Sequence, residues 1–97
     1  MIEFEWDLNK AKKNLQKHRV SFSEAATIFS DGLSITIYDP DHSDQEDRFI
    51  TIGTSNTGSF LMVAHTDRAD RTRIISAREL TRKELKVYEK EIQRRTR

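Results

Sequence analysis

The chain has 97 residues, 35% of them hydrophobic and 34% charged, with a net charge of +1 and no cysteine. That length allows one domain with a single modest core, which we place over residues 1–97. The composition excludes disulfides, thiolate catalysis and cysteine-based zinc sites, and no apolar run approaches the roughly 20 residues of a membrane-spanning helix. The acidic, aromatic start is not that of a signal peptide, so we expect a cytoplasmic protein with no membrane partner.

The N-terminal third is predicted to hold an extended segment and two helices. Residues 1–6 alternate weakly between apolar and acidic side chains, which fits either an edge strand or an extended lead-in. Asp7 is a suitable N-cap for a helix that ends near His18. The apolar stripe of this helix is predicted to consist of Leu8, Ala11, Leu15 and His18. Residues 21–24 form a capping box for a second helix, which residues 31–32 end.

The rest of the chain is predicted to form a sheet and a final helix. Alternating or β-branched runs predict strands over residues 33–38, 48–53, 60–66 and 71–78. Their short connections favour an antiparallel meander. A capping box at residues 81–84, flanked by Leu80 and Leu85, begins the final helix. The predicted fold is therefore α+β, with two N-terminal helices, a four-stranded antiparallel sheet and a C-terminal helix.

The segment 39–47 is rich in acidic side chains and has two interpretations. Its Asp, Glu and His residues could form a hard-metal cluster, but their spacing fits no EF-hand loop. We favour an acidic loop that keeps a sheet edge from associating, and we expect no metal or other cofactor.

The hairpin formed by the last two predicted strands carries His65 and four arginines. His65 shares a strand face with Leu61 and Val63, so it is either a core histidine or a proton-transfer group in a cleft wall, which we slightly favour. By parity, Arg73 and Arg78 are predicted on opposite faces of the sheet. At the strand end, a guanidinium at position 78 could hold a phosphate with two hydrogen bonds. The alternative is an ion pair between Arg78 and Glu79 or Glu84.

Charge is distributed unevenly along the chain. Residues 1–47 hold five Lys/Arg and ten Asp/Glu, a balance of −5, whereas residues 68–97 hold eleven Lys/Arg and five Asp/Glu, a balance of +6. A basic half suggests a patch that faces an anionic partner. Charge alone also fits a solvated helix laced with ion pairs.

Several segments, taken in order along the chain, resemble one family. They are residues 4–7, 14–18, 20–22, 24–26, 39–43, 46–49 and 74–78. Together they are similar to BrnT, the toxin of a type II toxin–antitoxin system. One departure is Arg19, where the family usually has a glycine at a helix C-cap; a left-handed arginine there would cost roughly 1 kcal/mol.

The resemblance implies a RelE-like fold and a metal-independent endoribonuclease that blocks translation. It also implies neutralisation by a BrnA-like antitoxin, a dimeric ribbon-helix-helix protein through which the complex would bind and repress its own operator DNA. The alternative is a non-catalytic module that binds nucleic acid or antitoxin.

Metal-free RNA cleavage needs a proton acceptor, cations that stabilise the phosphorane, and a proton donor for the leaving oxygen. The candidate catalytic residues are Arg78, His65, Arg82 and Tyr88, with His18 as a further proton-transfer candidate. The candidate RNA-binding residues are Arg48, Arg73, Lys17, Lys83 and Lys86.

Overall fold

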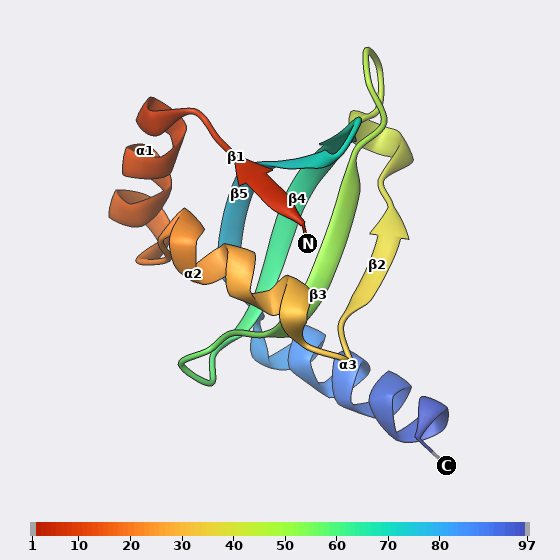
Figure 1. The fold of residues 1–97 in the computed structure, drawn as a ribbon. Helices are drawn as coiled ribbons and strands as arrows, with labels where there is room; N and C mark the ends of the chain where they lie inside the picture. Colours follow the sequence, from red (N-terminus) through yellow and green to blue (C-terminus); the bar gives the residue numbers. More distant parts are fainter. Residues whose placement is uncertain (1, 97) are drawn as a thin grey trace.

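The computed structural model describes residues 2–96 and has an α+β architecture (Figure 1). Two N-terminal helices cover one face of a sheet, and the C-terminal helix lies at the lower end of that sheet. The elements in chain order are β1 (Glu3–Glu5), α1 (Leu8–His18), α2 (Phe22–Thr27), the 3-10 turn η1 (Ile28–Ser30), β2 (Ile35–Tyr38), the 3-10 turn η2 (Pro40–His42), β3 (Phe49–Thr54), β4 (Phe60–Arg68), β5 (Arg71–Glu79) and α3 (Arg82–Arg95). Within this part of the chain, no helix is long and apolar enough to cross a membrane.

The sheet has five strands in the order β1-β5-β4-β3-β2, so the prediction of four strands is wrong. Strands β2 to β5 form the expected antiparallel meander, but β1 adds to β5 in parallel and makes the sheet mixed. Phe4 turns toward the helices and packs on Phe29, with 5.2 Å between the ring centroids. Three residues are too few for a strong alternating pattern, which explains why residues 1–6 left two interpretations open.

The main core lies between the sheet and the N-terminal helices. Strands β4 and β5 contribute side chains that are at most 1% exposed: Leu61, Val63, Ile74 and Ala77. The helical layer contributes Val20, Phe22, Ala25 and Ile28. Burial of each large apolar side chain stabilises the fold by about 2 kcal/mol. The opposite face of the sheet is left to α3 and to solvent.

Helix α1 is attached to the sheet mainly by a polar side chain, and of the three apolar residues in the predicted stripe only Ala11 packs against the core. Leu8 is 78% exposed and Leu15 is 47% exposed, so they do not belong to the inward face. Asn14 is 6% exposed instead. Its Nδ2 donates to the carbonyl oxygens of Val20 (2.9 Å) and Ala77 (2.8 Å), and its Oδ1 accepts from the amide of Ala77 (3.0 Å). This side chain thus joins the α1–α2 connection to the middle of β5.

We expect Asn14→Ala to lower the free energy of unfolding by about 3 kcal/mol. The substitution leaves three buried backbone groups without partners, and each such group costs about 1–3 kcal/mol. Urea unfolding measures the change. The matched control is Asn9→Ala on the exposed side of the same helix, expected to stay within about 0.5 kcal/mol of wild type. Equal losses in the two variants would show that the three bonds contribute nothing beyond helix propensity.

Helix α1 ends in the left-handed geometry that favours glycine. Arg19 has φ 60° and ψ 26°, and its amide donates to the carbonyl oxygen of Leu15 at 3.0 Å. The turn that a glycine normally makes therefore persists with an arginine in place.

We expect Arg19→Gly to raise the free energy of unfolding by about 0.5–1 kcal/mol, because glycine adopts this conformation without strain. For a domain of this size, the thermal midpoint then rises by about 4–8 °C for each kcal/mol. Lys12→Gly, in the middle of α1, is the control and should lower stability by about 1 kcal/mol. A lower midpoint for Arg19→Gly would contradict the strain argument.

An irregularity in β5 changes which side chains share a face. Ala64 pairs with Ser76, whereas the next residue, His65, pairs with Ile74, so Ile75 is an extra residue in β5. Bulges of this kind redirect side chains. Ile74 and Ala77 are both buried under the helices. Arg73 and Arg78, which flank this pair, therefore lie together on the open face, and the parity prediction of opposite faces is wrong.

Candidate active site

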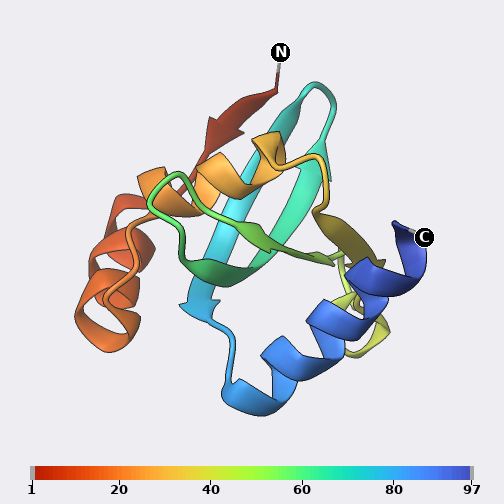
Figure 2. The same cartoon turned by 90° about the horizontal axis from the view of Figure 1, so that it is seen from below.

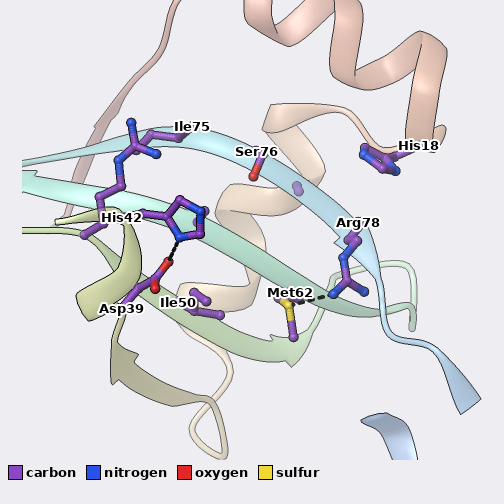
Figure 3. A pocket seen from close by; sticks show the side chains of 11 residues that line it. His18, Asp39, His42, Ile50, Met62, Ile75, Ser76 and Arg78 are labelled. Carbon is purple, nitrogen blue, oxygen red and sulfur yellow. Dashed lines mark hydrogen bonds and ion pairs between the residues drawn. The ribbon is translucent and has the colours of Figure 1, made fainter. Parts of the chain in front are cut away.

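A pocket of about 320 Å³ lies on the open face of the sheet, near its centre (Figure 3). Its residues come from segments far apart in the chain: the end of α1, the turn η2 and strands β3, β4 and β5. They are His18, Asp39, His42, Arg48, Ile50, Met62, Ala64, Ile75, Ser76, Ala77 and Arg78.

The pocket combines an apolar floor with a basic rim. Strand pairing places Ile50, Ala64 and Ser76 side by side across the sheet, and the bulge adds Ile75. The polar side chains rise around this floor. Figure 3 shows His42 with Asp39 on one side of the pocket and His18 with Arg78 on the other. Such a rim suits a small anionic group held over a partly apolar surface.

Arg78 is held at the pocket by a bidentate ion pair with Glu84. Its Nη1 and Nη2 donate to the two carboxylate oxygens of Glu84 at 2.7 and 2.9 Å, and Nη2 also contacts Sδ of Met62 at 3.2 Å. The bonds from Arg78 hold the pKa of Glu84 at about 2, with a further contribution from the amide of Thr81, which donates to the same carboxylate at 2.8 Å. The expected pair with Glu84 therefore exists. It leaves 37% of the Arg78 side chain exposed and fixes the guanidinium beside the pocket.

His42 is oriented by a carboxylate. Its Nδ1 lies 2.9 Å from Oδ2 of Asp39, whose side chain is only 16% exposed, whereas the His42 side chain is 65% exposed. The backbone carbonyl of Asp39 accepts from the hydroxyl of Ser43, and this hydroxyl accepts from the amide of Arg48. These bonds tie η2 to the start of β3. Within residues 2–96, no group of three or more metal-binding side chains is arranged to hold a metal ion.

His65 does not line this pocket, and the expectation of a cleft position is wrong. It is 2% exposed and lies on the face that the helices cover, with Phe29 edge-on at 4.9 Å and Phe49 stacked at 5.9 Å. Its Nε2 is 2.7 Å from Oγ1 of Thr51, and its Nδ1 is 3.2 Å from Oδ1 of Asp67. Burial lowers the pKa of His65, and the nearby Asp67 offsets this only in part.

The structure does not bring Arg82 and Tyr88 to the pocket either. Arg82 is exposed in the first turn of α3. Tyr88 is 6% exposed, its hydroxyl donates to the carbonyl of Leu33 at 3.3 Å, and its ring packs on Phe60. Burial raises the pKa of Tyr88. Tyr88 instead lines an apolar groove that α3 forms with Ile35 and Ile52 of the sheet. Figure 2 shows the α3 ribbon on the other side of the molecule from α1.

The predicted RNA-binding residues are spread over three places. Arg48 lines the pocket, and Lys17 is exposed beside His18. Arg73 shares the open face but pairs with Glu5 at 3.3 Å. Lys83 and Lys86 are exposed on α3.

Sequence reasoning did not single out His42 and Asp39 as a pair. The sequence places them only in an acidic cluster, because nothing local shows that η2 and the end of α1 line the same pocket. The one available signal was their position in segment 39–43, which contributed to the family resemblance.

Taken together, the fold is an α+β domain of three helices and a five-stranded mixed sheet, with a basic pocket on its open face. A family model described as "Ribonuclease toxin, BrnT, of type II toxin-antitoxin system" matches residues 6–84. The chain therefore belongs to the BrnT family of ribonuclease toxins.

The crystal structure of the Brucella abortus ribonuclease toxin BrnT is similar, with a TM-score of 0.63 and 21% sequence identity over 84% of this chain and 100% of that one. At this identity the likeness shows the fold. No curated protein sequence matches the chain.

Proposed function

We propose that this protein is a metal-independent endoribonuclease that cleaves RNA in the pocket on its open sheet face and thereby blocks translation. The observation that carries the proposal is the rim of that pocket, where two arginines and two histidines surround an apolar floor. Membership of a ribonuclease toxin family supports the choice of RNA as the substrate.

Arg78 and Arg48 have the chemistry to bind the scissile phosphate. A guanidinium donates two parallel hydrogen bonds to phosphate oxygens and stays charged at every physiological pH. As the ribose 2′-oxygen attacks, negative charge grows on the non-bridging oxygens, and cations fixed beforehand stabilise it. The two hydrogen bonds to the Glu84 carboxylate hold the Arg78 guanidinium in position before substrate binds.

Additional RNA contacts extend outward from the pocket. Lys17 is exposed next to His18 at the end of α1, and we expect it to contact a phosphate beside the cleaved one. Arg73 lies further along the same face of β5. We place Lys83 and Lys86 of α3 at the periphery, where they increase affinity through long-range attraction.

The direct test is cleavage of RNA by the purified protein in excess EDTA, together with growth arrest when the chain is expressed without an antitoxin. Cleaved RNA in EDTA would support the proposal, because no divalent metal would then be free to act. RNA that stays intact at stoichiometric protein would contradict it.

The second candidate is a module that binds nucleic acid without cutting it. The observation that favours it is that several arginines on the open face already form ion pairs within the protein, among them Arg78 with Glu84 and Arg68 with Glu46. Binding that weakens steeply with salt, with no cleavage at any pH, would favour this candidate.

We propose that the neutralising partner is a BrnA-like ribbon-helix-helix antitoxin and that this complex, through the antitoxin, binds operator DNA. Two features of the surface suit a partner segment. Strand β2 is an edge strand with Ile37 and Tyr38 each 50% exposed, and Val87 on α3 is 64% exposed beside the apolar groove. An edge strand and a groove are ready sites for an added strand or helix.

We expect the double substitution Lys83→Glu/Lys86→Glu to weaken the antitoxin complex about tenfold, mainly through slower association. Lys83 lines the groove and Lys86 is exposed three residues further along α3, so both lysines attract acidic side chains of a partner. Titration of the variant with the purified antitoxin measures the change. Unchanged affinity would place the interface on the acidic half of the chain.

A further inference from the structure

The pocket contains a set of proton-transfer groups that differs from the one expected. Its ionisable side chains are His18, Asp39, His42, Arg48 and Arg78. Arginine does not release its proton at physiological pH, so neither arginine can act as a general acid or base. The Asp39 carboxylate is engaged with His42. Since His65 lies in the core and Tyr88 lies in another groove, the two histidines are the groups left at the pocket for this work.

We propose that His42 is the general base and His18 the general acid of the reaction, with Asp39 as the residue that positions His42. The inference rests on the proposed ribonuclease function and assigns the proton transfers at the same pocket.

The hydrogen bond to Asp39 fixes the role of His42. A carboxylate on Nδ1 stabilises the tautomer with a proton on Nδ1, which leaves Nε2 free to accept one. The same carboxylate stabilises the imidazolium that forms when Nε2 takes a proton from substrate. His42 is 65% exposed on the pocket rim, so a ribose hydroxyl can reach it.

The placement of His18 matches the other role. In an in-line displacement the attacking and leaving oxygens lie on opposite sides of phosphorus, so the base and the acid must approach from opposite sides. Figure 3 shows His18 across the pocket from His42 and close to Arg78. A phosphate held by Arg78 would then have one histidine on each side.

The reaction balances without a co-reactant. Nε2 of His42 takes the proton of the 2′-hydroxyl as the 2′-oxygen bonds to phosphorus. The bond from phosphorus to the 5′-oxygen breaks, and His18 gives its proton to that oxygen. The products are an RNA end with a 2′,3′-cyclic phosphate and an RNA end with a 5′-hydroxyl.

Charges around each histidine come from several elements. His42 faces Asp39 of its own segment, Arg48 just before β3 and the loop carboxylates of Asp41, Asp44 and Glu46. His18 lies on the same side of the pocket as Arg78 of β5, with Lys17 and Arg19 as chain neighbours. Because these charges influence both histidines, the test compares the cleavage rate of each variant with that of wild type at every pH.

The experiment measures kcat/KM on an RNA oligonucleotide with one cleavable phosphodiester, in EDTA, from about pH 5 to 9. His18→Gln and His42→Gln should each lower it by about 10²–10⁴-fold, the usual contribution of a general acid or base. His42→Gln should lose the limb that rises with pH, and His18→Gln the limb that falls. Lys12→Gln on the exposed side of α1 is the control, expected within about twofold of wild type.

A second substrate separates the two roles. When sulfur replaces the bridging 5′-oxygen, the leaving group departs without a proton, so His18→Gln should recover to within about tenfold of wild type while His42→Gln stays slow. Thermal unfolding verifies that each variant folds, and His18→Asn replaces His18→Gln if the latter does not.

The assignment would be overturned if kcat/KM of each single variant stayed within about threefold of wild type, or if each variant lost the same factor on both substrates. Either result would leave the ribonuclease proposal intact. Rescue of His42→Gln alone would reverse the two roles. Wild-type protein that leaves the oligonucleotide intact would overturn the proposed function itself.

Discussion

We expect Arg78→Ala to lower kcat for RNA cleavage by about a hundredfold to a thousandfold, because the variant lacks a fixed cation where the phosphorane charge develops. The fold should survive the change. Arg78 is partly exposed, and exposed ion pairs such as the one with Glu84 contribute about 0–1 kcal/mol. The capping bonds between Thr81 and Glu84 do not depend on Arg78, so α3 should still begin at Arg82. Single-turnover cleavage together with urea unfolding measures both quantities.

Two further variants sharpen this result. Arg78→Lys keeps the charge but loses the bidentate geometry, so its rate should fall between those of wild type and Arg78→Ala. Arg71→Ala is the matched control, since Arg71 is on the same strand and also pairs with a glutamate, Glu3, but lies outside the pocket. If Arg78→Ala instead lost several kcal/mol of stability and cleaved RNA normally per folded molecule, Arg78 would be a structural ion-pair residue.

The elements that the sequence predicted well are those with local signals. The N-caps Ser21 and Thr81 begin helices where expected, because each cap bonds to an amide three residues on. Both bonds of the capping box form at Thr81, whereas the Glu24 carboxylate accepts from Ser55 and Thr57 instead of from the Ser21 amide. The alternation of β2 and β3 predicted the two strands but not which face the helices cover. Thr51 is the buried residue, 1% exposed, whereas Ile50 and Ile52 line grooves on the open face. In contrast, β1 is defined by its parallel pairing with β5, almost the whole chain away, and three residues carry too little pattern to reveal that pairing.

The pocket was predictable only in part, for a related reason. The sequence identifies Arg78 and Arg48 as candidates because a guanidinium group can bind RNA phosphates from any exposed position. The position of Arg73 was mispredicted because the bulge at Ile75 shifts the register, and no turn residue or glycine marks it. His65 was misplaced because parity determines which face it shares with Leu61 and Val63, but not whether helices cover that face. That η2 and the end of α1 line the same pocket is a tertiary arrangement that no local pattern shows.

His65 gives the largest expected effect on stability. We expect His65→Ala to lower the free energy of unfolding by about 3–5 kcal/mol, because it leaves a cavity between Phe29 and Phe49 and removes one hydrogen-bond partner each from Thr51 and Asp67. His65→Gln keeps part of the volume and of the hydrogen bonding, so its loss should be smaller.

The stability of the wild type should also depend on pH through this residue. Burial depresses the pKa of His65 in the folded state below the ordinary value of 6.5. The neutral ring is therefore favoured by folding, and its contribution is complete above pH 6.5 and is lost as pH falls through the folded-state pKa. The free energy of unfolding can change through this group by up to about 1.4 kcal/mol per pH unit. Urea unfolding of wild type and His65→Gln between pH 8 and 5 should show the curves converging as the pH falls. The cleavage rate of His65→Gln per folded molecule should match that of wild type. If this variant folds normally but its cleavage rate loses the rise or the fall with pH, His65 takes part in the proton transfers.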